Sequence, residues 1–359
     1  MNKAGRATDF FIAANGPMGF VSYFEELCQE EALEHLLILK AGPGCGKSTL
    51  MKRMAALREG EEEVQRLHCS ADPESLDGVL FSGSRLAIVD GTAPHVIEPT
   101  FPGAFERVVD LYHCLDEEKL KTHRAEIVEA HRNNKALLAR CRSLIGGAGA
   151  LVGEIYQIAA PCTDREKILR YTASLSKRLA TSKKEGRGRE SRRFLTCLGA
   201  GDQASFPANI PTLCSQTVVL HDRWGAAGRI FMESLKEHLL EAGYDVICCP
   251  CPLFPHHKIE HLFVPELGLG VFTSNDFHAF DLPGAKNIHA RRFTQMQPLD
   301  AKSARVRFHM KAAKNLLSQA DTLMKEAKAW HDQLEKYYVS ACDFTEIDSI
   351  FETLIAKYF

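Results

Sequence analysis

A glycine-rich segment near the N-terminus constrains the fold of this chain more than any other feature. Residues 35–58 read HLLILKAGPGCGKSTLMKRMAALR: an apolar run, a six-residue stretch with three glycines, and a segment without glycine or proline. This pattern predicts a buried strand, a tight loop and a helix. The loop matches G-x-x-x-x-G-K-[ST] in a relaxed form, with Ala41 at the first position and then Gly46, Lys47 and Ser48. The sequence therefore predicts an α/β unit with a phosphate-binding loop.

The residue types of this loop suit a nucleotide. Glycines let the backbone turn so that successive N–H groups point at phosphate oxygens, and the helix that follows presents its positive end to them. Lys47 is expected to reach the β- and γ-phosphates, Ser48 to ligate Mg²⁺ and Thr49 to touch the α-phosphate. Cys45 occupies a small-residue position near a helix N-terminus, which lowers a thiol pKa. The predicted nucleotide-binding residues are Gly42, Pro43, Gly44, Cys45, Gly46, Lys47, Ser48 and Thr49. The alternative is a strand-to-helix turn with no ligand.

A second apolar run supplies the acidic partner that such a loop needs. Residues 84–91 read SRLAIVDG, so that Asp90 ends a predicted buried strand. A carboxylate at the end of a parallel strand lies beside the loop of the neighbouring strand, as a Walker B aspartate does. Lys47 and Asp90 are thus the predicted catalytic residues, and Ser48 and Asp90 the predicted Mg²⁺ ligands. Gly91 stands where many P-loop ATPases carry glutamate. The candidates for the group that activates water are Asp72, Asp77, His95 and Glu98.

The second half of the chain repeats the first. LDGVLFSGSRLAIVDGTAPH aligns with IEHLFVPELGLGVFTSNDFH, so that Leu86 matches Leu269 and His95 matches His278. Further matches occur in the same order along most of the chain, which indicates an internal duplication. The predicted domains are an N-terminal P-loop domain at 1–179 and a degenerate copy at 192–359. The polar, basic segment 180–191, ATSKKEGRGRES, is the predicted linker.

The second copy lacks the residues that a nucleotide needs. At a shift of 182 residues, Gly42, Gly44, Gly46, Lys47 and Ser48 correspond to Trp224, Ala226, Gly228, Arg229 and Ile230. After one inserted residue near His256, Asp90 corresponds to Thr273. The lysine, the Mg²⁺ hydroxyl and the metal carboxylate are all replaced. We therefore expect no Mg-nucleotide chemistry in the second half. The alternative is a divergent site that binds an anion through Arg229.

Each half ends in a segment with helical periodicity. Residues 117–158 and 301–338 carry apolar positions at helical spacing among many charges. We expect these segments to form helical hairpins added to the α/β cores. These segments would bury an apolar face either against the other half of the chain or against a protein partner, and the sequence does not distinguish the two.

Composition limits the other classes of partner. The chain has 359 residues, 45% of them hydrophobic, and a formal net charge of -2. Without a basic excess, nucleic acid and anionic membranes are not expected as main partners. We expect a cytoplasmic protein because we find no long apolar run or signal peptide, and its 12 cysteines are then reduced.

The order of several longer motifs resembles a known family. FFIAANGPMGFVSYF, ILKAGPGCGKSTLM, HCSADPESLDGV and IVDGTAPHVIEP are similar to segments of an uncharacterised family of bacterial tandem P-loop ATPases. The resemblance implies two P-loop domains and ATP binding with hydrolysis, at Gly42, Gly44, Gly46, Lys47, Ser48, Thr49 and Asp90. Members often keep a usable loop in the second half, which this chain does not.

Together these observations predict a Mg²⁺-dependent ATPase with one competent site in the N-terminal half and a regulatory or scaffolding C-terminal half. A small-molecule kinase, with Asp72 or Asp77 as its base, is an alternative. A nucleotide-gated binding module with negligible turnover is another, because Gly91 replaces the usual glutamate. ATP is expected over GTP, since no guanine-reading motif is found.

Overall fold

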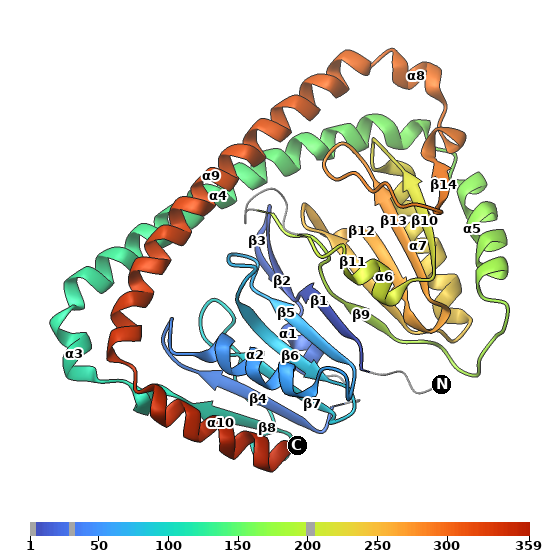
Figure 1. Ribbon diagram of the computed structural model, residues 1–359. Helices are drawn as coiled ribbons and strands as arrows, with labels where there is room; N and C mark the ends of the chain where they lie inside the picture. The colour runs from blue at the N-terminus through green and yellow to red at the C-terminus, as the bar shows by residue number, and fades with distance from the viewer. Residues whose placement is uncertain (1–4, 29–32, 199–204) are drawn as a thin grey trace.

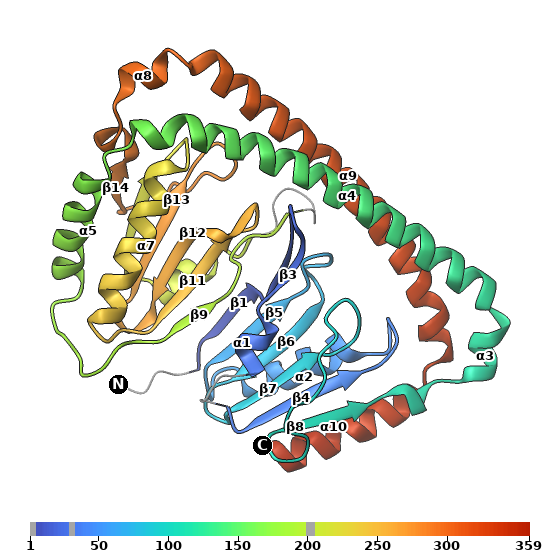
Figure 2. The same ribbon diagram turned by 180° about the vertical axis from the view of Figure 1, so that it is seen from behind.

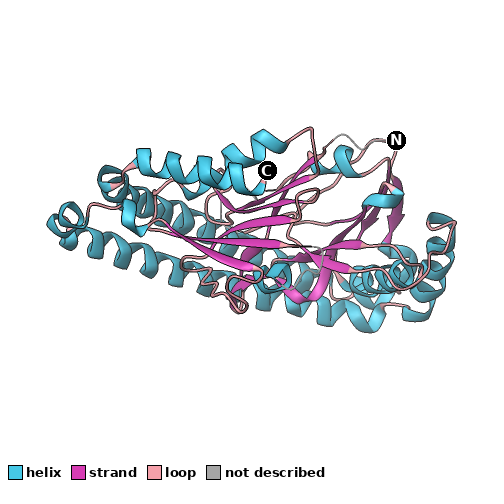
Figure 3. Ribbon diagram, turned by 90° about the horizontal axis from the view of Figure 1, so that it is seen from below, coloured by secondary structure: helices cyan, strands magenta, loops and turns pink. Residues whose placement is uncertain are grey.

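The computed structural model describes residues 5–28, 33–198 and 205–359 and contains two six-stranded sheets (Figure 1). The first sheet has, in order, β1 (Ala7–Phe11), β5 (Val64–His68), β6 (Leu76–Phe81), β7 (Leu86–Asp90), β4 (His35–Lys40) and β8 (Glu106–Asp110). The second has β9 (Glu190–Arg192), β11 (Val246–Cys251), β12 (Phe254–Val264), β13 (Leu269–Ser274), β10 (Gln216–His221) and β14 (Lys286–His289). The predicted α/β class is confirmed, with parallel strand pairs and flanking helices (Figure 3).

The two sheets have the same strand order and directions. In each sheet one strand, β6 or β12, runs antiparallel to both of its neighbours, and the other neighbouring pairs are parallel. The central strands β4 and β7 carry four consecutive buried residues each, as expected for strands covered on both faces. Glu190 and Ser191, the last residues of the segment predicted as linker, belong to strand β9.

The longer helices follow these strands along the chain. They are α2 (Lys47–Arg58), α4 (Arg124–Ala159), α5 (Arg165–Leu179), α7 (Ala226–Glu241), α9 (Ser303–Ala341) and α10 (Phe344–Tyr358). The shorter elements are β2 (Ala13–Gly16), β3 (Gly19–Ser22), α1 (Phe24–Cys28), η1 (Tyr112–Cys114), α3 (Glu117–Thr122), η2 (Ala160–Cys162), α6 (Asn209–Leu213), η3 (Pro265–Leu267), η4 (Ala290–Phe293) and α8 (Met296–Asp300).

The two sequence halves exchange their last helices. Helix α5 ends the first half but packs on α7, with Ile168 and Leu175 in the core of the second sheet. Helix α10 ends the second half but packs at the first sheet, with Phe351 and Leu354 in its core. An aspartate caps each helix: Asp164 accepts a hydrogen bond from an amide of the first turn of α5, and Asp343 does the same for α10.

The predicted helical hairpins are wrong. The first segment forms the short α3 and then one long helix, α4, and the second forms the long helix α9. Helices α4 and α9 lie side by side and antiparallel along both sheets (Figure 2). Asn134 Nδ2 donates to the carbonyl of Ala327, and Cys141 Sγ donates to that of Ala320. The apolar face of each helix is therefore buried against the helix of the other half, so neither segment needs to fold back on itself.

One stretch, Arg124–Cys162, is long and apolar enough by composition to cross a membrane. It contains α4 and η2 and packs against α9, as a helix of a soluble α/β protein does.

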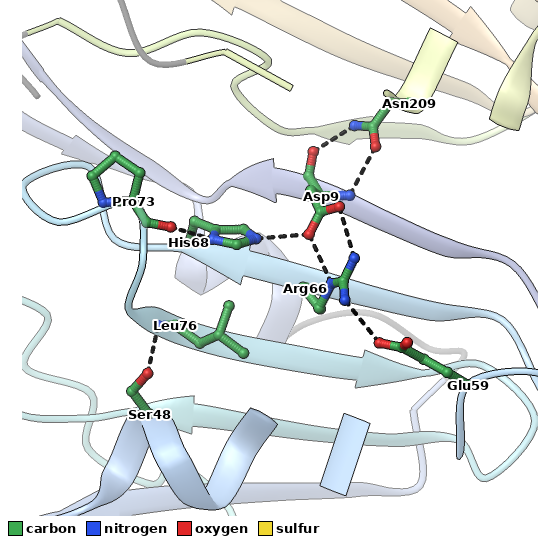
Figure 4. A network of polar contacts seen from close by, with 8 residues as sticks. All are labelled: Asp9, Ser48, Glu59, Arg66, His68, Pro73, Leu76 and Asn209. Atoms are coloured by element: carbon green, nitrogen blue, oxygen red, sulfur yellow. Dashed lines mark hydrogen bonds and ion pairs between the residues drawn. The ribbon is translucent and has the colours of Figure 1, made fainter. Parts of the chain in front are cut away.

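The two halves also share a core between their sheets. Phe10 of β1 packs edge-on against Phe263 of β12, and the backbones of Phe11 and Phe194 form a reciprocal pair of hydrogen bonds. Asn209 of α6 accepts from the Asp9 amide at 2.8 Å and donates to the Asp9 carbonyl (Figure 4). Asparagine thus satisfies the backbone of an edge strand from the other half, which fixes the two sheets together.

The side chain of Asp9 anchors the same edge strand to β5. Its carboxylate accepts bidentate hydrogen bonds from Arg66 at 2.7 and 2.9 Å and lies 2.7 Å from His68 Nε2 (Figure 4). Burial alone would raise the pKa of Asp9, but the bonds from His68 and Arg66 outweigh it and hold this pKa below its usual value.

Candidate functional site

The first loop joins the end of β4 to the start of α2. Gly46 precedes the helix in the left-handed conformation, with φ of 76°, and lets the chain turn from strand to helix. Lys47 is buried, and its Nζ donates to the carbonyls of Ala41 and Gly42 at 3.0 and 2.9 Å. The lysine side chain therefore curls back over the loop that it follows.

The amides of this loop form a cluster of donors. Within the described part of the chain, no residue accepts a hydrogen bond from the backbone N–H groups between Gly44 and Thr49. They combine the free N–H groups of a helix start with those of the preceding loop. Such a set binds anions, because the donors and the positive end of the helix lie at the same place.

The predicted metal ligands lie close to the loop. Leu39 of β4 is paired in register with Asp90 of β7, and Asp90 Oδ2 lies 3.5 Å from Lys47 Nζ. Asp90 Oδ1 accepts hydrogen bonds from the amide and hydroxyl of Thr92, which fix the carboxylate. Ser48 Oγ accepts a hydrogen bond from the Leu76 amide at 2.9 Å (Figure 4). Lys47, Ser48 and Asp90 are therefore brought together.

The remaining predicted residues of the loop take different positions. Cys45 is buried, Pro43 is half-buried and the side chain of Thr49 is exposed on the first turn of α2. Burial raises the pKa of the Cys45 thiol, although Lys47 opposes the change. The expectation that the helix N-terminus lowers this pKa is therefore wrong, because desolvation of the thiolate is the larger effect.

Two of the four candidate water-activating residues meet beside Asp90. The pairing of β6 and β7 reaches Gly78 and Val89, so that Asp77 and Asp90 come next on adjacent strands. His95 Nε2 lies 3.0 Å from Asp77 Oδ2, and both side chains are buried. The rings of Phe20 and Phe24 pack against His95 with centroids 4.8 and 5.1 Å away.

The other two candidates are engaged elsewhere. Asp72 accepts a hydrogen bond from Ser75 and lies 3.7 Å from Lys328 of α9. Glu98 is exposed and pairs with Lys40 at 2.7 Å. Recurrence is the sequence signal that singles out Asp77 and His95, because Glu260 and His278 form an equivalent pair at 2.8 Å in the second half.

No sequence pattern indicates that α9 touches the first loop. A Cβ atom on Gly42 would lie 2.5 Å from the ring of Tyr338, and one on Gly44 would lie 2.9 Å from Val339 Cγ2. Both partners belong to the last turns of α9. The second half therefore contributes part of the wall around the loop of the first half.

The second loop differs from the first in length. Strand β10 ends at His221 and α7 begins at Ala226, so four residues replace six. Gly225, with φ of 70°, precedes the helix as Gly46 does in the first half. The predicted match of Gly46 with Gly228 is therefore wrong, because the alignment had no gap in this loop and ignored the two missing residues. Arg229 and Ile230 then no longer correspond to Lys47 and Ser48.

Charged side chains gather beside the second loop. Lys258 Nζ lies 2.6 Å from Glu260 Oε2, and Thr273, at the position of Asp90, donates to Glu260 Oε1. Burial would raise the pKa of Glu260, but Lys258 and His278 hold it well below its usual value. Arg229 packs over the rings of Tyr156 and Phe254 at 4.1 and 4.6 Å from their centroids. Arg229, Lys258 and Glu260 line a pocket with about 570 Å³ of empty space, its open mouth included.

No family model, curated protein or solved structure was found to match this chain.

Proposed function

We propose that this protein binds ATP in the first loop and hydrolyses it with Mg²⁺. The observation that carries the proposal is the grouping of free loop amides, Lys47, Ser48 and Asp90 at the carboxyl ends of β4 and β7. This set supplies anion donors, a cation and two oxygen ligands, which together match the requirements of a Mg-nucleotide.

Each residue has a role that follows from its position. The loop amides and Lys47 would hold the phosphates, and Lys47 would exchange its bonds to the carbonyls of Ala41 and Gly42 for phosphate oxygens. Ser48 Oγ and Asp90 would hold Mg²⁺, directly or through water. The metal would supply charge neutralisation on the β- and γ-phosphates. The nucleotide is proposed to be ATP.

The water-activating group is proposed to be Asp77. It lies on the strand next to Asp90, and His95 keeps its carboxylate in place from a pocket of aromatic rings. A buried carboxylate in this position can orient water and accept its proton. This residue would replace the glutamate that is missing at Gly91.

The second half is proposed to be a degenerate copy of the P-loop domain. The shared strand order and the exchange of α5 and α10 support a duplication. Thr273 in place of Asp90 and the shortened loop support the loss of nucleotide chemistry. The second half would act as a regulator or scaffold, and the exposed sides of α4 and α9 would be the surface for a protein partner. We expect the protein in the cytoplasm.

A second candidate function is a nucleotide-gated module with little turnover. It is favoured by the contact of α9 with the first loop, since Tyr338 and Val339 lie against Gly42 and Gly44. Phosphates that enter the loop would shift the end of this helix. Nucleotide binding would then change the helix pair that spans both halves.

Phosphate release tests the proposal and separates the two candidates. The expected result is Mg²⁺-dependent release from ATP without any acceptor, lost in Lys47→Ala and Asp90→Asn. Lys52→Ala is the matched control, because Lys52 is an exposed lysine on the same helix. Binding without release would favour the gated module. Release that survives Lys47→Ala would contradict the assignment of the site.

A further inference from the structure

The second loop is already bound by a carboxylate of the chain itself. Asp222 directly follows β10, and its side chain is buried. Its Oδ1 accepts hydrogen bonds from the amides of Trp224 and Gly225 at 3.2 and 3.1 Å. Its Oδ2 accepts one from the Gly228 amide, in the first turn of α7, at 2.6 Å. The Asp222 carboxylate thus accepts hydrogen bonds from two loop amides and from one amide in the first turn of the helix.

The first loop has no such group at the same place. Leu39 pairs with Asp90 and Leu220 pairs with Thr273, so the two sheets are aligned at these strands. Two residues further along, the first half has Ala41 and the second has Asp222. The amides that the first loop leaves without a partner are therefore matched, in the second loop, by amides bonded to a carboxylate.

The surroundings of Asp222 are also those of a bound anion. Gly228 lets the carboxylate approach the helix, because a Cβ at that position would lie 3.0 Å from Asp222 Oδ2. The ammonium of Lys258, which pairs with Glu260, lies beside the loop, 3.9 Å from where a Cβ on Gly225 would be. Burial raises the pKa of Asp222, and the Gly228 amide and the charge of Lys258 oppose this rise. Lysine, glycine and amides thus surround the carboxylate, as they would surround a phosphate.

We propose that the Asp222 carboxylate is a built-in substitute for phosphate, and that removing it opens the second loop to inorganic phosphate. The second half then keeps the shape of a liganded loop at all times and cannot respond to a nucleotide. This inference goes beyond the ATPase proposal and does not depend on it, since it concerns only the second loop.

The test uses the full-length chain in a Lys47→Ala background, which silences the first loop. Asp222→Ala gives the second loop the residue that the first loop carries. We expect its thermal midpoint to fall by several degrees, and to rise again with added inorganic phosphate but not with chloride at equal ionic strength. The parent and Asp281→Ala, which removes an exposed aspartate, should not respond to phosphate.

Three results would overturn the proposal. They are an unchanged midpoint in Asp222→Ala, a lowered midpoint that phosphate does not restore, and an equal response to phosphate in the Asp281→Ala control. If Asp222→Ala does not fold, Asp222→Ser decides the question. Its shorter hydroxyl can still accept from the Trp224 amide while leaving room for an anion, so it must show the phosphate response.

Discussion

The exchange of the terminal helices predicts opposite effects for two equivalent leucines. Leu175 of α5 and Leu354 of α10 occupy the same position relative to their capping aspartates, and both are buried. Leu354 lies in the core of the first sheet although it belongs to the second half of the sequence. Leu354→Ala should therefore destabilise the first sheet, and Leu175→Ala the second.

The size of the effect follows from the burial. Replacing a fully buried leucine by alanine costs about 2–5 kcal/mol, from lost burial and the cavity that remains. A value of about 3 kcal/mol corresponds to roughly a hundredfold increase in the population of the open form. Amides whose exchange requires opening of that sheet should exchange faster by this factor.

Hydrogen exchange with mass spectrometry reads the two sheets separately. In Leu354→Ala we expect faster exchange in β4, residues 35–40, and little change in β10, residues 216–221. In Leu175→Ala we expect the reverse. If Leu354→Ala accelerated hydrogen exchange in β10 and left β4 protected, α10 would pack on the sheet of its own half. That result would refute the reasoning.

Three further predictions concern the first site and the edge of its sheet. Asp77→Asn should lower kcat for ATP hydrolysis by about 10²-fold or more in steady-state kinetics. Its affinity for ATP, measured by calorimetry, should be unchanged. An unchanged kcat would exclude Asp77 as the base. Gly44→Ala should weaken ATP binding, measured by calorimetry, at least tenfold, because the φ of 71° and the contact with Val339 both oppose a side chain. The control is Gly153→Ala, on a helix with open space around that position. Asp9 has a lowered pKa in the folded chain, so its contribution to stability is present above its unfolded pKa of about 3.9 and is lost as the pH falls through the folded value. Urea titrations between pH 7 and pH 3 should show a smaller loss of stability in Asp9→Asn than in the wild type, and an equal loss would contradict this.

The parts of the site that were predicted from sequence belong to one continuous segment or recur in both halves of the sequence. A strand, a loop and a helix in one segment specify the position of Lys47 and Ser48, and a carboxylate at a strand end specifies Asp90. The pair of Asp77 and His95 could have been predicted, since both positions recur as acid and histidine in the second half. Local geometry therefore accounts for the core of the candidate site.

The parts that were not predicted depend on loop length and on packing over long distances. Asp222 was missed because an alignment without a gap in the second loop assigned the wrong cap glycine to it. The helix exchange was missed because α5 and α10 have similar apolar faces and the two sheets are alike, so either helix fits either sheet by pattern alone. The continuous course of α4 and α9 decides the pairing, and periodicity does not distinguish one long helix from two short ones.

Calorimetry with Mg-ATP on the wild type and on Lys47→Ala tests most directly whether the chain has one competent site. The account predicts one nucleotide bound per chain and no binding by Lys47→Ala, with Lys52→Ala binding as the wild type does. Two nucleotides per chain, or normal binding by Lys47→Ala, would contradict it.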